Sequence, residues 1–146
     1  MTLMNKEAFK KGFQDGVPIA LGYAAVSFAL GIAARNSGLS WIEATVMSLL
    51  NNTSAGEFAA LELIRTGAPY AELAITQLVI NLRYLLMSCA LSQKMDEKTS
   101  VFHRLLVGFD VTDEIFGISI AYPGKLNPFY SYGAIIISIP CWAAGT

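Results

Sequence analysis

A polar interruption of an apolar stretch has the clearest capacity for chemistry in this sequence. Between Leu49 and Leu63 the chain reads LLNNTSAGEFAALEL. Its amide, hydroxyl and carboxyl groups can hydrogen-bond a ligand, and asparagine and serine favour helix ends over helix interiors. We therefore predict a substrate-binding or coupling site at this interruption. The candidate residues are Asn51, Asn52, Ser54, Gly56 and Glu57.

A second set of polar residues recurs at helical spacing in the next apolar segment. Gln77, Asn81, Tyr84 and Ser88 are separated by four, three and four positions, so they form one stripe along a helix. Such a stripe should face protein or water, and its first three residues join the candidate site. Arg83 lies off the stripe near the middle of the segment, where an unpaired charge costs at least about 2.5 kcal/mol. Arg83 therefore needs an acidic partner.

Three acidic residues of the following apolar segment are candidate partners for that arginine. Asp110, Asp113 and Glu114 share one face of the helix expected there. One interpretation is a proton or ion path that uses these carboxylates together with Glu57. The alternative is a structural salt bridge from Arg83 to Asp110 or Asp113, with the remaining acids in a hydrated vestibule.

Signatures of enzymes, metals and nucleic-acid binding are missing from the sequence. It contains no HExxH, GxSxG or Walker motif, and it has a single histidine. The two cysteines lie in apolar runs without metal-ligand spacing, and the net charge of -1 gives no basic stripe for nucleic acid. We expect no enzyme activity, no metal and no cofactor. A membrane-embedded hydrolase that uses Glu57 and Asp110 as paired acids is the alternative.

The elements that position these residues are predicted to be membrane helices. The chain of 146 residues is 54% hydrophobic and 14% charged, against roughly 25% charged residues in soluble domains. About five hydrophobic segments are separated by glycine, proline and polar residues, and they lack the alternation of barrel strands. The segments are 17–34, 41–64, 71–91, 101–122 and 129 to the end.

We predict an all-α integral membrane protein with one transmembrane domain over residues 1–146. Residues 1–16, which carry three lysines, should lie at the membrane surface, and Pro18 suits the start of the first spanning helix. The sequence leaves two alternatives open. Residues 17–34 could belong to a cleaved signal peptide, and the whole chain could be a soluble helical protein with a very apolar core.

The second segment is predicted to be a broken or re-entrant helix pair. The polar interruption divides it into two apolar pieces of 10 residues, each about 15 Å long and therefore half a bilayer. If the segment crosses fully, five basic residues lie inside and four outside; if it re-enters, six lie inside and three outside. Cytoplasmic loops are richer in lysine and arginine, so the count favours the re-entrant course.

Several short motifs, in order along most of the chain, resemble the AzlC family. They are Phe13-Gln14-Asp15-Gly16-Val17-Pro18, Gly38-Leu39-Ser40, Ser54-Ala55-Gly56-Glu57-Phe58-Ala59-Ala60, Asn81-Leu82-Arg83-Tyr84 and Thr112-Asp113-Glu114-Ile115-Phe116. The resemblance implies an inner-membrane permease that exports branched-chain amino acids, is driven by an ion gradient and works with a small hydrophobic AzlD-type subunit. It also argues against an enzyme.

Two departures from the family pattern qualify that expectation. Glu57 stands where family members commonly have glutamine, which would affect substrate, coupling ion or protonation. Family members also continue through further helices, whereas this chain stops within an apolar segment, which predicts a truncated product. The rival class is a non-transporting membrane scaffold or accessory subunit, in which buried polar groups only hold helices together.

Overall fold

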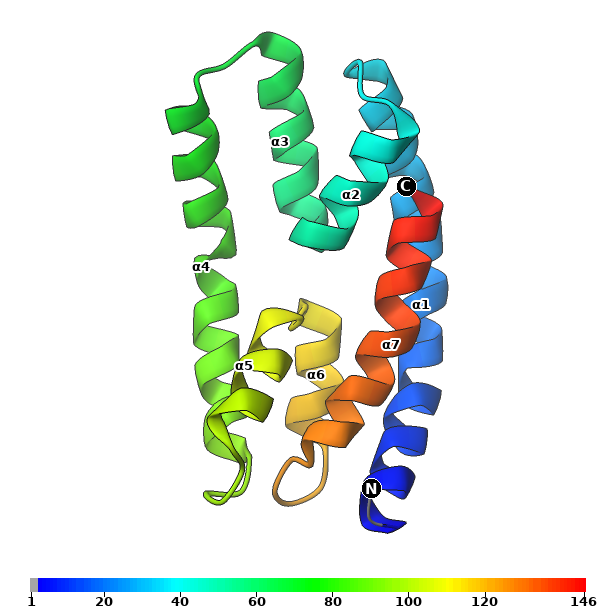
Figure 1. Cartoon of the computed structure of the whole chain (residues 1–146), viewed down its shortest axis with the longest axis vertical. Coiled ribbons are helices and arrows are strands. Elements are labelled where there is room, and N and C mark those ends of the chain that lie inside the picture. Colours follow the sequence, from blue (N-terminus) through cyan, green and yellow to red (C-terminus); the bar gives the residue numbers. More distant parts are fainter. Residues whose placement is uncertain (1–2) are drawn as a thin grey trace. The chain divides into compact units, whose positions relative to one another are not determined.

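The computed structural model describes residues 3–146, and the elements it forms there are α-helices (Figure 1). The described residues contain no strand beyond an isolated bridge between Met95 and Leu126. The predicted all-α class is therefore confirmed. The helices are α1 (Leu3–Asn36), α2 (Trp41–Asn51), α3 (Ser54–Thr66), α4 (Tyr70–Lys94), α5 (Val101–Phe109), α6 (Asp113–Ala121) and α7 (Pro128–Gly145).

The chain divides into two compact units. Unit 1 contains Met1–Ala20 and Arg83–Ser138, and unit 2 contains Leu21–Leu82 and Ile139–Thr146. Helices α1, α4 and α7 each contribute residues to both units. Each unit also holds one pair of short helices, α5 and α6 in unit 1 and α2 and α3 in unit 2.

In unit 2, the second predicted segment forms a helical hairpin. Ser40 begins α2 through a capping box, in which its hydroxyl accepts from the Glu43 N–H and the Glu43 carboxylate accepts from the Ser40 N–H. The hairpin α2–α3 breaks at Asn52, whose φ of 43° is left-handed, and at Thr53, which is extended. Helix α3 returns to the end of the unit from which α2 came (Figure 1). The predicted break is thus confirmed, and the chain reverses there.

Unit 1 contains a second hairpin, and the prediction of one helix over 101–122 is wrong. Helix α5 ends at Phe109 with Asp110 as its C-cap, and α6 begins after Thr112, whose hydroxyl accepts from the Ile115 N–H at 3.3 Å. An N-cap residue needs extended backbone, so a capping threonine at this point interrupts the helix. Helix α6 then returns to the end of unit 1 from which α5 came (Figure 1).

The two hairpins repeat one capping pattern. A serine caps the first helix of each, Ser40 for α2 and Ser100 for α5. A threonine in extended conformation precedes the second helix of each, Thr53 for α3 and Thr112 for α6. Each hairpin follows a long helix, so α1–α2–α3 and α4–α5–α6 are two copies of the same supersecondary arrangement.

Helix α1 runs unbroken from Leu3 to Asn36, so the prediction that Pro18 starts the first spanning helix is wrong. Proline removes one backbone hydrogen bond and favours a break. Close packing of α1 on α7 in unit 1 accompanies the unbroken helix. A Cβ atom on Gly12 would lie 1.8 Å from the Tyr130 carbonyl oxygen, and one on Gly133 would lie 2.1 Å from the Phe9 carbonyl oxygen. The two backbones therefore approach more closely than side chains would permit.

Among residues 3–146, two helices are long and apolar enough to cross a bilayer. These are α1 and α4, of 34 and 25 residues. The second segment is therefore the broken pair that was predicted, whereas the prediction that the fourth segment is one span is wrong, because the helices of both hairpins have only 9 to 13 residues. A span needs about 20 residues, so each hairpin helix is between about half and two thirds as long as a span.

Candidate functional site

The carboxyl group of Glu57 lies at the tip of hairpin α2–α3 and is fully buried. Ser48 of α2 donates to its Oε2 at 2.6 Å. Its Oε1 accepts from the Trp142 indole N–H at 2.9 Å and from the Thr53 backbone N–H at 3.3 Å. Both oxygens therefore have donors, and the carboxyl group joins the two helices of the hairpin to α7 within unit 2.

Aromatic and hydroxyl groups surround this carboxyl group. The Tyr23 ring packs edge-on against Trp142, with ring centroids 5.4 Å apart. The Thr146 hydroxyl lies 2.9 Å from Ser48 Oγ and 3.1 Å from the Trp142 carbonyl oxygen. These contacts leave Glu57 no exposed surface, so a ligand reaches it only if α7 or the hairpin moves.

A chain of amides connects α4 to the same hairpin tip. Gln77 Nε2 donates to the Gly56 carbonyl at 2.8 Å, and Asn81 Nδ2 donates to Gln77 Oε1 at 3.2 Å. A Cβ atom on Gly56 would lie 2.7 Å from Gln77 Oε1, so a larger residue there would displace the Gln77 side chain from this position. The predicted stripe of α4 thus faces protein at these two positions. Both polar atoms of the Asn52 side chain and the Asn81 Oδ1 atom are buried without a hydrogen-bond partner among residues 3–146.

The same stripe contacts the second hairpin within unit 1. Ser88 Oγ donates to the Gly108 carbonyl of α5 at 3.0 Å and lies 2.7 Å from the Tyr84 carbonyl. A Cβ atom on Gly108 would meet the Ser88 side chain at 3.2 Å. Serine and glycine at these positions allow α4 and α5 to pack closely.

Arg83 pairs with Asp113 rather than with Asp110. Its Nη1 atom lies 2.7 Å from Asp113 Oδ2, its Nη2 atom donates to the Tyr84 hydroxyl at 3.0 Å, and its guanidinium lies 4.8 Å from the Tyr84 ring centroid. Asp110 is the C-cap of α5, while Asp113 and Glu114 form the first turn of α6. The expectation that these three acids share one helix face is therefore wrong, because the helix breaks between them.

The remaining candidates, Asn51 and Ser54, flank the tip of hairpin α2–α3. Asn51 is the last residue of α2 and is half-buried, whereas Ser54 opens α3 and is exposed. Within residues 3–146 no group of three histidine, cysteine or acidic side chains is arranged to hold a metal ion. The side chains at the hairpin tips can therefore interact with a ligand through hydrogen bonds and charge.

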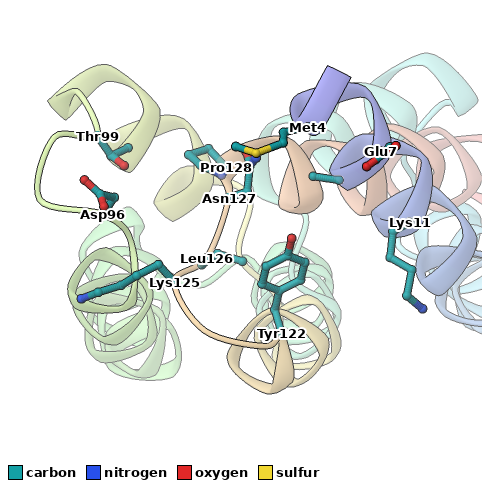
Figure 2. A pocket seen from close by; sticks show the side chains of 11 residues that line it. Met4, Glu7, Lys11, Asp96, Thr99, Tyr122, Lys125, Leu126, Asn127 and Pro128 are labelled. Atoms are coloured by element: carbon teal, nitrogen blue, oxygen red, sulfur yellow. The ribbon is translucent and has the colours of Figure 1, made fainter. Parts of the chain in front are cut away.

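A cavity of about 570 Å³ in unit 1 was not anticipated from the sequence. Its charged lining is mixed, with Glu7 and Lys11 from α1, Asp96 after α4, and Lys125 before α7 (Figure 2). Tyr122 also points into it in this view. The sequence places these residues in a terminal segment and two loops, so only the fold of unit 1 reveals the cavity.

Lys11 is paired at the edge of this region. Its Nζ lies 2.7 Å from Asp15 Oδ1, and Asp15 Oδ2 accepts from the Tyr130 hydroxyl at 2.8 Å. Asp15 precedes the apolar stretch 17–34. Partial burial raises the pKa of Asp15, but hydrogen bonds from Lys11 and Tyr130 outweigh this effect and hold that pKa below its usual value.

Helix α4 carries apolar side chains that contact little of the protein. The exposed residues are Ile75, Leu78, Val79, Leu82, Leu85 and Leu86, with 50% to 72% of their surface accessible. A continuous apolar surface of this kind requires lipid or another protein to cover it.

Comparison with known proteins identifies similar membrane proteins. A family model described as AzlC protein matches residues 18–146. The chain is 30% identical over 145 residues to an uncharacterized membrane protein of Archaeoglobus fulgidus, covering 99% of this chain and 63% of that protein. It is 26% identical over 142 residues to the inner membrane protein YgaZ of Escherichia coli, covering 94% of this chain and 58% of YgaZ.

A third relative is an uncharacterized membrane protein of Helicobacter pylori, 28% identical over 120 residues, with 82% of this chain and 51% of the relative covered. The chain thus spans between half and two thirds of the length of these curated relatives. No solved structure matches it.

Proposed function

Because this chain belongs to the AzlC family of membrane proteins, we propose that it is a transporter subunit that exports branched-chain or similar hydrophobic amino acids. The resemblance drawn from its motifs is confirmed by the family match over residues 18–146. The proposal adds that export is coupled to an ion gradient, that an AzlD-type subunit participates, and that the protein is not an enzyme.

The polar tip of hairpin α2–α3 carries this proposal. In transporters with broken helices, half-helix ends near the bilayer midplane bind the charged groups of the substrate and the coupling ion. Here the tip combines a left-handed Asn52, the amide pair Gln77 and Asn81, and buried polar atoms without partners. A tip of this composition suits a polar ligand inside an otherwise apolar protein.

The distribution of basic residues supports a multi-pass topology in the inner membrane with both hairpins re-entrant. In this proposed topology α1 and α4 cross the bilayer, and the N-terminus and the loops at 95–100 and 122–127 are cytoplasmic. Seven basic residues then lie on the cytoplasmic side and two on the other, compared with six and three when only the second segment re-enters. The seven are Lys6, Lys10, Lys11, Lys94, Lys98, Arg104 and Lys125, and the two are Arg35 and Arg65.

Broad substrate specificity should follow from this kind of site. Contacts with an apolar side chain distinguish one methylene group by only about 1 to 3 kcal/mol. Leucine, isoleucine and valine should therefore all be carried, with modest differences in rate.

A non-transporting membrane subunit is the second candidate function, and the contacts of Glu57 favour it. Both of its carboxylate oxygens are used in joining the hairpin to α7, as expected of a structural group. The Arg83–Asp113 pair is equally consistent with a structural role. Transport measurements separate the two candidates.

The test is efflux of preloaded labelled leucine from cells that express the chain, with and without an AzlD-type partner. Arg83→Ala is the test variant, and Arg65→Ala is the control, because Arg65 pairs with Glu62 on the exposed surface of α3. We expect efflux that is lost in Arg83→Ala and kept in Arg65→Ala. Efflux no greater than in cells without the chain, at normal membrane abundance, would refute the exporter and leave the structural subunit.

A further inference from the structure

We infer that the tip of hairpin α2–α3 binds a small monovalent cationic group, an ammonium or Na⁺, through the neutral amide oxygens of Asn52 and Asn81. This inference deepens the proposed function and rests on it for the identity of the ammonium group, which would be that of the amino acid substrate.

The hydrogen-bond chain fixes which atom of Asn81 is available. The Gly56 carbonyl can only accept, so Gln77 presents its NH₂ group to it. Gln77 then presents its oxygen to Asn81, which must donate with its own NH₂ group. The atom of Asn81 left without a partner is therefore the Oδ1 oxygen, an acceptor.

The Asn52 side chain adds a second buried oxygen at the hairpin tip, next to its own NH₂ group, which also has no hydrogen-bond partner among residues 3–146. Asn52 holds a left-handed conformation at the C-cap of α2, a conformation that concentrates at functional sites. The carbonyl end of a helix carries partial negative charge, so the end of α2 also favours a cation. The Asn81 oxygen, the Asn52 oxygen and the carbonyl end of α2 thus all attract positive charge, and none of them carries a full negative charge.

An anion is disfavoured at this tip because its described unpartnered atoms are two oxygens against one NH₂ group, that of Asn52, and because the positive end of α3 is already occupied. The positive end of α3 faces the Glu57 carboxylate, which accepts the Thr53 N–H. The same carboxylate is otherwise committed to Ser48 and Trp142. A divalent cation such as Ca²⁺ usually requires carboxylate ligands, so neutral oxygens suit a monovalent charge.

The experiment measures binding to the purified full chain in detergent, by the shift of its thermal unfolding midpoint. The probes are leucine, 3-methylbutylamine, which lacks the carboxylate, 4-methylpentanoate, which lacks the ammonium, and NaCl against choline chloride at equal ionic strength. We expect a shift with the amine, with Na⁺ or with both, and none with 4-methylpentanoate. A shift with the amine identifies the substrate ammonium as the ligand, and a shift with Na⁺ identifies the coupling ion.

Variants assign the binding to the amide oxygens. Asn81→Leu removes the side-chain oxygen that would bind the positively charged group, and it should weaken binding at least about tenfold. Asn81→Asp keeps an oxygen and adds charge, so it should bind as tightly or more tightly, and it serves if the leucine variant fails to fold. Gln93→Leu, which changes an exposed amide of the same helix, is the control and should bind as the parent does.

The outcomes separate this inference from the exporter proposal. Equal shifts with 4-methylpentanoate and leucine, unchanged binding in both Asn81 variants, or no shift with any probe would overturn the cation site. Leucine efflux that persists in Asn81→Leu would also overturn it while the exporter stands. Cation binding through Asn81 without leucine efflux would support the site and refute the exporter.

Discussion

Replacing Glu57 by alanine should strongly destabilise the protein, whereas Glu57→Gln should change its stability little. Alanine removes the acceptor of three buried donors, namely the Ser48 hydroxyl, the Trp142 indole N–H and the Thr53 backbone N–H, and of these the Ser48 hydroxyl can turn instead to the Thr146 hydroxyl. A buried donor left unsatisfied costs about 1 to 3 kcal/mol. Because neighbouring contributions do not add fully, we expect a loss of about 3 kcal/mol or more in the free energy of unfolding.

Glutamine retains the hydrogen bonds that alanine removes. Its carbonyl oxygen can accept from Trp142 and Thr53, and its NH₂ group can donate to the Ser48 hydroxyl, which is able to rotate. The Ser48 hydrogen then turns toward the Thr146 hydroxyl, which lies 2.9 Å away. The free energy of unfolding should change by less than about 1 kcal/mol, which is the size of one ordinary hydrogen bond.

The assay is denaturant unfolding in detergent, followed by tryptophan fluorescence, because Trp142 contacts the altered side chain. Glu62→Ala is the control, since Glu62 lies in the same helix with 59% of its side chain exposed. Unfolding of Glu57→Ala at the same denaturant concentration as Glu62→Ala would refute the assignment of these hydrogen bonds. Separately, transport by Glu57→Gln with an unchanged rate and pH profile would refute a coupling role for Glu57.

Three further results are expected. Gly133→Val should lower the free energy of unfolding by about 3 kcal/mol, because its Cβ would lie 2.1 Å from the Phe9 carbonyl oxygen. Gly117→Ala is the control, since the space around its Cβ is open, and thermal unfolding should show no loss of stability for it. The lowered pKa of Asp15 adds stability that is complete above its unfolded-state pKa near 3.9 and is lost as the pH falls through the lower folded-state pKa. In denaturant unfolding between pH 2 and 6, Asp15→Asn should therefore reduce the dependence of the unfolding free energy on pH. An unchanged pH dependence would contradict this. In a background without Cys89 and Cys141, a cysteine at Ser37 should react with an impermeant maleimide in intact cells and one at Thr99 should not; equal labelling would contradict the re-entrant topology.

Local chemistry was enough to predict part of this structure. Asparagine, serine and glycine are unfavourable in helix interiors, so the sequence alone places the break of the second segment between Asn51 and Gly56. The demand of Arg83 for an acidic partner could likewise be foreseen, because a charge in an apolar segment is unfavourable alone. The break depends on residues within a few positions of one another, and the need of Arg83 for a partner depends on a general property of charge.

Tertiary structure decided the rest, because contacts between distant residues compete with local preference. Residues 101–122 resemble one helix with a polar face, and Thr112 becomes an N-cap only where Gly108 packs on Ser88 and the chain turns back. Pro18 marks a helix start by local rules, yet α1 continues through it beside α7. Glu57 and Trp142 are 85 positions apart, and no spacing rule relates them. The sequence determined where the chain can bend and which groups need partners; the packed structure determined which bends form and which partners meet.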